Sequence, residues 1–175
     1  MKTLVDQLAQ YAAYHRDRRN IATHLVGIPM IVFAITVLLS RPAFELGGIM
    51  LTPATLAVLL SVLYYFRLDL RYGLVMAILM GLALWGAQAL AAAPTATWLY
   101  AGIGLFVLGW ILQFIGHAWE GKKPAFVDDL IGLIIGPLFV VAEVGFLLGL
   151  GNAVRAEIER RVGPTHGQRT ASMGG

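Results

Sequence analysis

The chain has 175 residues, of which 58% are hydrophobic and 13% charged, and its mean hydropathy is +0.75. That composition excludes an ordinary soluble domain and indicates an integral membrane protein. The formal charge of +3 comes from basic residues between apolar runs, which is typical of lipid headgroup contacts and not of nucleic-acid binding, and the absence of cysteine excludes disulfides and sulfur-ligated metal sites.

The N-terminal segment predicts a short amphipathic helix. Apolar residues recur there at intervals of three and four, at Leu4, Val5, Leu8, Tyr11 and Ala12. Such a helix is expected to lie at the membrane interface, with the neighbouring basic residues among the lipid headgroups. Asn20 is expected to cap the next helix, and residues 21–40 carry no Asp, Glu, Lys or Arg, so they form the first predicted span.

Three more spans are predicted from uncharged runs. Residues 46–66 form the second, in which Thr52 and Pro53 suit a helix start or a kink. The 48 residues between Arg71 and Glu120 contain no charged side chain, which is enough for two helices. A turn at residues 93–95 divides them into spans at about 72–92 and 97–116.

The last apolar run, residues 130–150, is unusual because it contains Glu143 and the helix-breaking pair Gly136-Pro137. If this run enters the membrane and returns, 12 of the 13 Lys and Arg residues lie on one side, which the positive-inside rule favours. The predicted fold is therefore an all-α multi-pass transmembrane bundle with four spans and a broken or re-entrant last helix pair. Residues 1–162 form one membrane domain with a cytoplasmic N-terminus, and residues 163–175 form a flexible tail. The expected location is the inner membrane of a bacterium or the endoplasmic reticulum of a eukaryote.

Polar residues gather at the predicted cytoplasmic ends of the spans. Gln113, His117 and Glu120 are spaced four and three apart, so they share one helix face. His15 and His24 lie near the start of the first span, on the same side of the membrane as His117. Three imidazoles at one surface, with carboxylates nearby, are compatible with one iron or zinc ion.

Each polar residue also has an ordinary structural interpretation. His15 and His24 are nine residues apart and would face opposite ways on an unbroken helix, so they can share a metal only if the chain bends between them. Asn20 shares a face with His24 and is either its partner or the helix cap. Glu120 is a metal ligand, a general base, a partner of a ligating histidine, or an ion-pair partner of Lys122 or Lys123. Glu143 requires either a buried partner, such as an Arg or His of a neighbouring segment, or a raised pKa.

Two motifs resemble a known family. The first runs from Tyr11 to Pro29 and contains Tyr14, His15, Asn20, His24 and Gly27; the second runs from Gln113 to Ala125 as QFIGHAWEGKKPA, with an H-x-x-E spacing. Together they resemble the small multi-pass membrane proteins related to the Fe(II)-dependent 2-hydroxy fatty acid dioxygenase of phytosphingosine breakdown. This resemblance implies fatty acid α-oxidation, in which O₂ shortens a 2-hydroxy fatty acid by one carbon and CO₂ is released. It also implies that His15, His24 and His117 bind the iron.

Other partners and roles follow as hypotheses. The substrate carboxylate would meet Arg67, Arg71, Lys122 or Lys123, and Tyr14 would donate a hydrogen bond, while Glu120, Asn20 and Gln113 would support the ligands. Membrane lipids are expected partners, and a homo-oligomer is left open. The alternatives are a non-catalytic membrane scaffold or small transporter, and a b-type haem protein with His24 and His117 as axial ligands.

Overall fold

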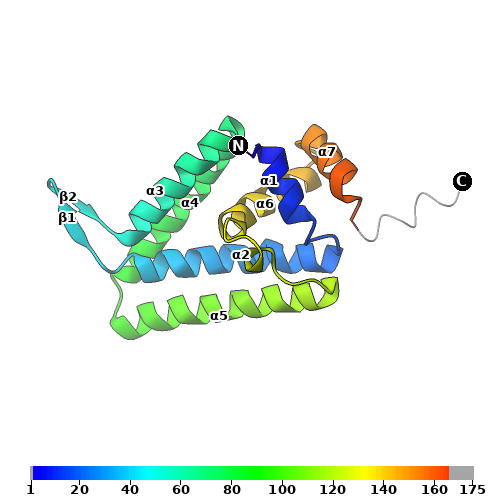
Figure 1. Cartoon of the computed structure of the whole chain (residues 1–175). Coiled ribbons are helices and arrows are strands. Elements are labelled where there is room, and N and C mark those ends of the chain that lie inside the picture. Colours follow the sequence, from blue (N-terminus) through cyan, green and yellow to red (C-terminus); the bar gives the residue numbers. More distant parts are fainter. Residues whose placement is uncertain (1, 166–175) are drawn as a thin grey trace, which may run out of the picture. The chain divides into compact units, whose positions relative to one another are not determined.

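The structure, a computed structural model, describes residues 2–165 and is predominantly helical (Figure 1). In chain order its elements are α1 (Leu4–Ala12), α2 (Arg18–Leu39), β1 (Phe44–Leu46), β2 (Ile49–Leu51), α3 (Pro53–Leu68), α4 (Leu70–Ala91), α5 (Thr95–Glu120), the 3₁₀ turn η1 (Ala125–Val127), α6 (Gly132–Leu147) and α7 (Asn152–Val162). The predicted all-α class is confirmed, with one small antiparallel hairpin added.

Three helices, α2, α4 and α5, are long and apolar enough to cross a membrane. Helices α6 and α7 pass the same test together but are bent by 113° at their junction, so the described residues hold up to four spans. This confirms a multi-pass membrane protein whose last helix pair is broken.

The structure differs from the second predicted span, residues 46–66, over the first residues of that span. Residues 46–51 belong to the hairpin, because Gly47 and Gly48 adopt positive φ angles of 60° and 82° that suit a tight two-residue turn. Thr52 then caps α3 through its side chain, and Pro53 takes the first helical position, as the sequence suggested. The resulting helix has 16 residues and is about 24 Å long, shorter than a hydrocarbon core of roughly 30 Å.

The residues form two compact units, Met1–Ile28 with Ile111–Gly175, and Pro29–Trp110. We call them the terminal unit and the central unit. Helices α2 and α5 run through both units. The predicted single domain over residues 1–162 stays a prediction, and the predicted tail lies outside the described residues from position 166 onward.

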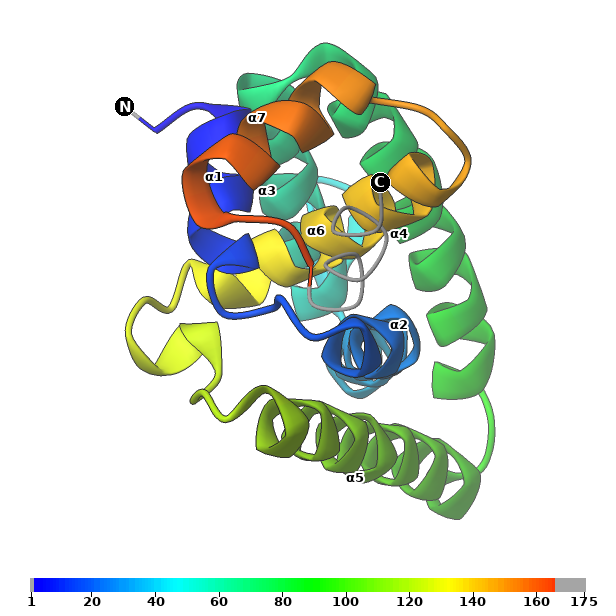
Figure 2. The ribbon, with the colours of Figure 1, turned by 90° about the vertical axis from the view of Figure 1, so that its right-hand side faces the viewer.

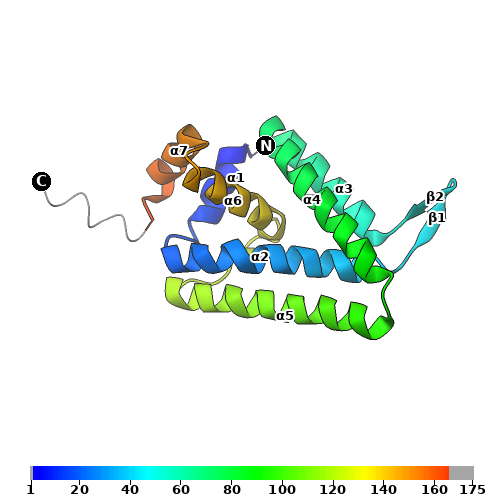
Figure 3. The same cartoon turned by 180° about the vertical axis from the view of Figure 1, so that it is seen from behind.

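In the central unit, α3 and α4 lie side by side, as Figure 3 shows. A Cβ at Gly73 of α4 would meet the backbone of Phe66 on α3, so the glycine permits this close approach. The first half of α5 contacts the end of α2, where the Trp98 indole donates a hydrogen bond to the Val37 carbonyl at 2.8 Å. This bond satisfies the indole N–H of Trp98 within the central unit.

In the terminal unit, α1 packs against α6 and α7 (Figure 2). Thr3 and Asp6 form a reciprocal capping box at the start of α1, and Leu4, Leu8 and Ala12 are buried. The predicted N-terminal helix is therefore present, and its apolar face is covered by protein. Its placement at a membrane surface stays a prediction.

Two local predictions in the terminal unit were wrong. Asn20 is not the cap of α2: the helix begins at Arg18, and the Asp17 carboxylate accepts the Arg19 N–H at 2.8 Å. The last apolar run does not break at Gly136-Pro137, because Pro137 lies inside α6. The bend follows α6, where Gly149 and Gly151 adopt positive φ angles of 77° and 67° that glycine tolerates without strain.

Candidate metal centre

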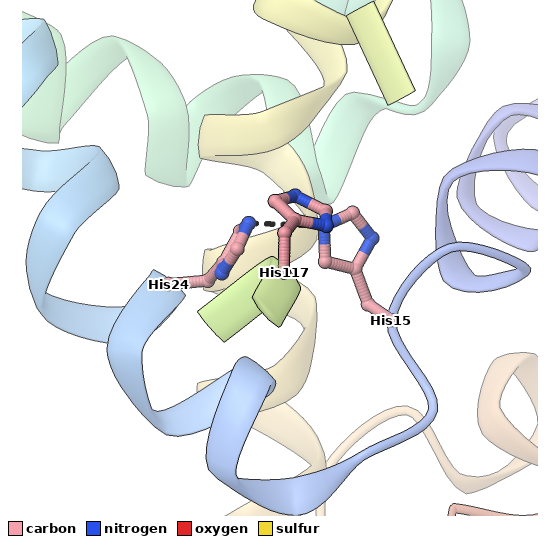
Figure 4. A group of neighbouring side chains, drawn as sticks. All are labelled: His15, His24 and His117. Carbon is pink, nitrogen blue, oxygen red and sulfur yellow. Dashed lines mark hydrogen bonds between the residues drawn. The ribbon is translucent and has the colours of Figure 1, made fainter. Parts of the chain in front are cut away.

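Three histidines meet in the terminal unit. His15 lies in the connection between α1 and α2, His24 on α2, and His117 near the end of α5 (Figure 4). One ring nitrogen from each lies within 4.8 Å of the others. Their exposed fractions are 0%, 1% and 6%, so the cluster is closed to bulk solvent. The bend required between His15 and His24 is supplied by residues 13–17, which lie outside the helices.

Backbone carbonyls determine which ring nitrogen of two histidines carries the proton. Nδ1 of His15 donates to the Tyr11 carbonyl at 2.8 Å, and Nδ1 of His24 donates to the Asn20 carbonyl at 2.9 Å, because a carbonyl can only accept. The lone pair of each neutral ring is then on Nε2. These two Nε2 atoms lie 3.0 Å apart.

Two lone pairs at that separation repel each other unless a proton or a cation lies with them. Burial lowers the pKa of His15 well below its usual value, and the neighbouring His24 and His117 lower it further. An additional proton is therefore disfavoured. A metal cation satisfies both nitrogens, and the same carbonyl contacts are those that orient ligating imidazoles in metal sites.

Aromatic rings cover His15. The Tyr11 ring is stacked on it with centroids 4.3 Å apart and an interplanar angle of 7°, and Phe139 of α6 lies 5.5 Å away. Tyr11 therefore contacts His15 in two ways: its carbonyl accepts a hydrogen bond from Nδ1, and its ring stacks on the imidazole. These contacts hold the imidazole in one orientation and exclude water from it.

A close approach of α2 and α5 brings His24 and His117 together. A Cβ at Gly116 would collide with the Thr23 hydroxyl oxygen and with Oδ1 of Asn20. A larger residue at this position would require the side chains of Asn20 and Thr23, or α2 itself, to shift. The residue directly before His117 therefore sets its distance from His24.

Glu120 ties the connection after His15 to α5. Its carboxylate accepts the backbone N–H groups of Arg16 and Asp17 at 2.8–3.0 Å, and it accepts a third hydrogen bond from the Asn20 side-chain amide at 3.0 Å. These N–H groups directly precede α2, whose helix dipole favours a carboxylate near its N-terminus. Glu120 thus links all three histidine-bearing segments without joining the histidine cluster.

Several buried polar atoms near the histidines have no partner among the described residues: Nδ1 of His117, Nε2 of Gln113 and Oδ1 of Asn20. Gln113 is 5% exposed and lies one helical turn from His117 on the same face of α5. Buried polar groups are normally hydrogen-bonded, so three orphan atoms in one region fit a site that takes an additional group.

The structure places the other predicted residues elsewhere. The Tyr14 hydroxyl donates to Asp128 at 2.7 Å, Lys122 donates to the Ala13 carbonyl at 2.8 Å, and Lys123 pairs with Asp128. Neither lysine pairs with Glu120. Arg67 and Arg71 belong to the central unit, so a role toward a substrate carboxylate stays a prediction for them. Glu143 is half-buried on α6, where the guanidinium groups of Arg16 and Arg155 attract its carboxylate.

Sequence reasoning assigned no role to three residues that shape the cluster. Tyr11 lies four residues before His15, a spacing that would have indicated a contact with it. Gly116 precedes His117 inside the second motif, but nothing in the sequence shows which side chains approach it. Phe139 carries no local signal, because its contact with His15 joins positions 124 residues apart.

Comparisons with known proteins identify the family of the chain. Residues 1–148 match the family described as 2-hydroxy-palmitic acid dioxygenase Mpo1-like. The chain is 34% identical over 161 residues to the 2-hydroxy-palmitic acid dioxygenase MPO1 of Saccharomyces cerevisiae. The aligned region covers 89% of this chain and 87% of that relative. No solved structure matches the chain.

Proposed function

Because the chain belongs to the Mpo1-like family, we propose that it is a non-haem, Fe(II)-dependent membrane dioxygenase that acts on 2-hydroxy fatty acids. The reaction would convert a 2-hydroxy fatty acid and O₂ into the fatty acid one carbon shorter, CO₂ and water. The observation that carries the proposal is the pair of unprotonated Nε2 atoms of His15 and His24, 3.0 Å apart and closed in by His117.

The residues present fit an iron ion. His15, His24 and His117 would hold it, and three neutral imidazoles leave coordination positions for other groups. Bound Fe(II) would supply the one-electron chemistry that activates O₂. A b-type haem fits poorly, because the ring centroids of His24 and His117 are 4.9 Å apart and His15 lies 4.4–5.0 Å from both, which leaves no room for a macrocycle between them.

The chain's own residues supply orientation and exclusion of water. The carbonyls of Tyr11 and Asn20 hold two imidazoles with Nε2 toward the centre, and the Tyr11 and Phe139 rings shield His15. The unpartnered Nε2 of Gln113 is a hydrogen-bond donor for a substrate oxygen. The long hydrocarbon tail is compatible with a protein whose helices have apolar, lipid-compatible surfaces.

Metal content tests the proposal. Wild-type protein, purified in detergent without air, is expected to contain about one iron per chain and to consume O₂ with 2-hydroxypalmitate. His117→Ala should lose both iron and turnover, while eluting as the same folded species in size-exclusion chromatography. His166→Ala is the matched control, because His166 is the one histidine of the sequence that the proposal does not assign to the iron. Metal-free wild-type protein, zinc in place of iron, or full activity in His117→Ala would contradict the proposal.

A scaffold or transporter would give a different result in the same experiment. Such a protein would carry no stoichiometric iron, and His117→Ala would behave like the wild type. Location in a particular membrane, an N-terminus in the cytoplasm and contacts with membrane lipids remain part of the proposal, supported by the three apolar helices and by the distribution of Lys and Arg.

A further inference from the structure

A cavity of about 230 Å³ lies in the terminal unit, beside the histidine cluster. It is lined by the connection before α2, by α2 itself, and by α6 and α7. The mechanism above uses none of its side chains. Its walls combine guanidinium groups, carboxylates and hydrocarbon, which is the composition expected for a site that holds an amphiphile.

The cations of the cavity outnumber their internal partners. Arg155 and Glu159 neutralise each other through a 2.9 Å ion pair. Arg16 is buried, and within residues 2–165 its guanidinium donates to the carbonyls of Ala12, His15 and Gly163. Neither Arg16 nor Arg18 forms a salt bridge with a described residue. Three guanidinium groups and two carboxylates, those of Glu143 and Glu159, line the cavity, so its walls carry one net positive charge, which favours an anion.

One acid and several apolar side chains complete the cavity. Glu143 lines it and makes no salt bridge within the part of the chain that the structure describes, so its carboxylate is an available hydrogen-bond acceptor. Leu25, Phe146 and Ile158 supply hydrocarbon, and Leu147 at the rim is 73% exposed. The volume is below the roughly 300–1,000 Å³ of sites that enclose drug-sized ligands. It suits a polar head and the first methylene groups of a chain that continues past the rim.

Two residues that line the cavity are close neighbours of residues that contact His15 or of His15 itself. Arg16 follows His15 in the sequence, and its Nε donates to the His15 carbonyl at 3.0 Å. Phe139, which contacts the His15 ring, lies one helical turn from Glu143 on the same face of α6. Residues that hold His15 are thus direct neighbours of residues that line the cavity.

We propose that this cavity binds the head of a single-chain 2-hydroxy carboxylate, with Arg16 and Arg18 holding the carboxylate and Glu143 accepting the hydrogen bond of the 2-hydroxyl group. Leu25, Phe146 and Ile158 contact the adjoining methylene groups. Arg–carboxylate pairs are strong and geometrically specific, and a carboxylate acceptor distinguishes a hydroxylated chain from an unsubstituted one. The choice of a 2-hydroxy acid rests on the proposed function, whereas binding of the carboxylate does not require the iron.

Two neighbouring arginines provide a matched test. Arg18 lines the cavity, whereas Arg19 points elsewhere, pairs with Asp17 at 2.8 Å and lies over the Trp119 ring at 5.4 Å. Binding of radiolabelled 2-hydroxypalmitate to detergent-purified, chelator-treated protein is measured by scintillation proximity. Arg18→Gln should raise the Kd about tenfold, because it removes one charged hydrogen-bond donor, while Arg19→Gln should leave the Kd within about twofold.

Glu143→Gln tests the second half of the proposal. The wild type should prefer 2-hydroxypalmitate to palmitate, and the variant should lose most of that preference because the charged acceptor is gone. An unchanged Kd in Arg18→Gln, an equal loss in Arg18→Gln and Arg19→Gln, or a preserved preference in Glu143→Gln would overturn the assignment.

The failure of this proposal is distinguishable from the failure of the iron proposal. Binding is measured on metal-free protein, so it does not depend on the iron. If Arg18→Gln raises the Kd but the wild type never carries iron, the cavity is supported as a binding site and the dioxygenase proposal is wrong. Stoichiometric iron with no Arg18 effect would leave the metal centre in place and remove the cavity as its substrate site.

Discussion

Buried polar side chains occur in both compact units, and they are bonded differently in each. In the central unit, Thr36 donates to the Val32 carbonyl and Ser40 to the Thr36 carbonyl, each one turn back on the same helix. In the terminal unit, the Glu120 carboxylate and the Asn20 amide join groups 100 to 104 residues apart. A hydrogen bond within one helix satisfies a hydroxyl group whatever the position of that helix, whereas a hydrogen bond between distant segments forms only when those segments are correctly placed relative to each other.

The difference indicates that the two units have different roles. In the central unit, the hydroxyl groups of Thr36 and Ser40 are bonded to carbonyls of α2. The polar groups of the terminal unit are arranged around three imidazoles and leave several atoms unpartnered. If this contrast is functional, substitutions in the terminal unit should affect iron binding, while comparable substitutions in the central unit should affect only stability.

Glu120→Ala should have the largest effect. It leaves the N–H groups of Arg16 and Asp17 and the Asn20 amide without their acceptor, which costs about 3 kcal/mol and releases the segment that carries His15. We expect a lower Tm and an iron-to-chain ratio well below that of the wild type.

Trp98→Phe in the central unit is the control for Glu120→Ala. It removes one hydrogen bond, to Val37, at a cost of about 1 kcal/mol, and should keep full iron. Equal iron content in Glu120→Ala and the wild type would show that the carboxylate does not position the cluster.

Gly116→Ala should have the next largest effect. The added Cβ collides with Asn20 and Thr23, so α2 and α5 must separate at the level of His24 and His117. Overpacking of this kind costs about 2 kcal/mol, and it should weaken iron binding more than the loss in Tm alone accounts for. Iron affinity and Tm are measured together on the same preparations.

Gly104→Ala, on the same helix but in the central unit, is the matched control for Gly116→Ala. A Cβ at Gly104 meets nothing within 4 Å, so alanine should be neutral or slightly stabilising through its higher helix propensity. The proposed contrast between the units would fail if both alanine variants lost iron equally.

Asp6→Asn should have the smallest effect, and that effect should depend on pH. The Thr3 backbone N–H, followed by the Arg161 guanidinium, lowers the pKa of Asp6 from 3.8 to about 2. Because the folded pKa is depressed, the carboxylate stabilises the fold above about pH 4, and this contribution disappears as the pH falls from 3.8 towards 2. The Asp6 side chain is 38% exposed and its ion pair with Arg161 is at the surface, so the change in Tm will be small.

The pH series for Asp6→Asn is read as a difference from the wild type. The gap in Tm should be present at pH 6 and close at low pH, with iron content unchanged at neutral pH because Asp6 contacts α7 and not the histidine cluster. Glu45→Gln on the hairpin of the central unit serves as a control for the loss of an exposed acid. A constant gap across the pH range would contradict the assigned role of the carboxylate.

Much of the fold could be predicted from uncharged runs. Residues 21–40, 72–92 and 97–116 lie almost wholly within α2, α4 and α5, since hydrocarbon requires about 20 apolar residues whatever the neighbours are. Thr52 and Pro53 marked the start of α3 through their own capping chemistry. The broken last helix pair was predicted from charge placement, but its position was wrong. Gly136-Pro137 stays helical, and the left-handed glycines after α6 make the turn.

The sequence by itself determined that the protein enters a membrane, that residues 21–40, 72–92 and 97–116 form helices, and that His117 shares a helix face with Gln113 and Glu120, because hydropathy and helical periodicity act over a few residues. Only the tertiary structure decided that Glu120 receives the N–H groups of Arg16 and Asp17, that Gly116 lets α2 approach α5, and that a cavity with unpaired arginines adjoins His15. These contacts join segments about 100 or more residues apart, and their partners depend on packing that no local pattern specifies.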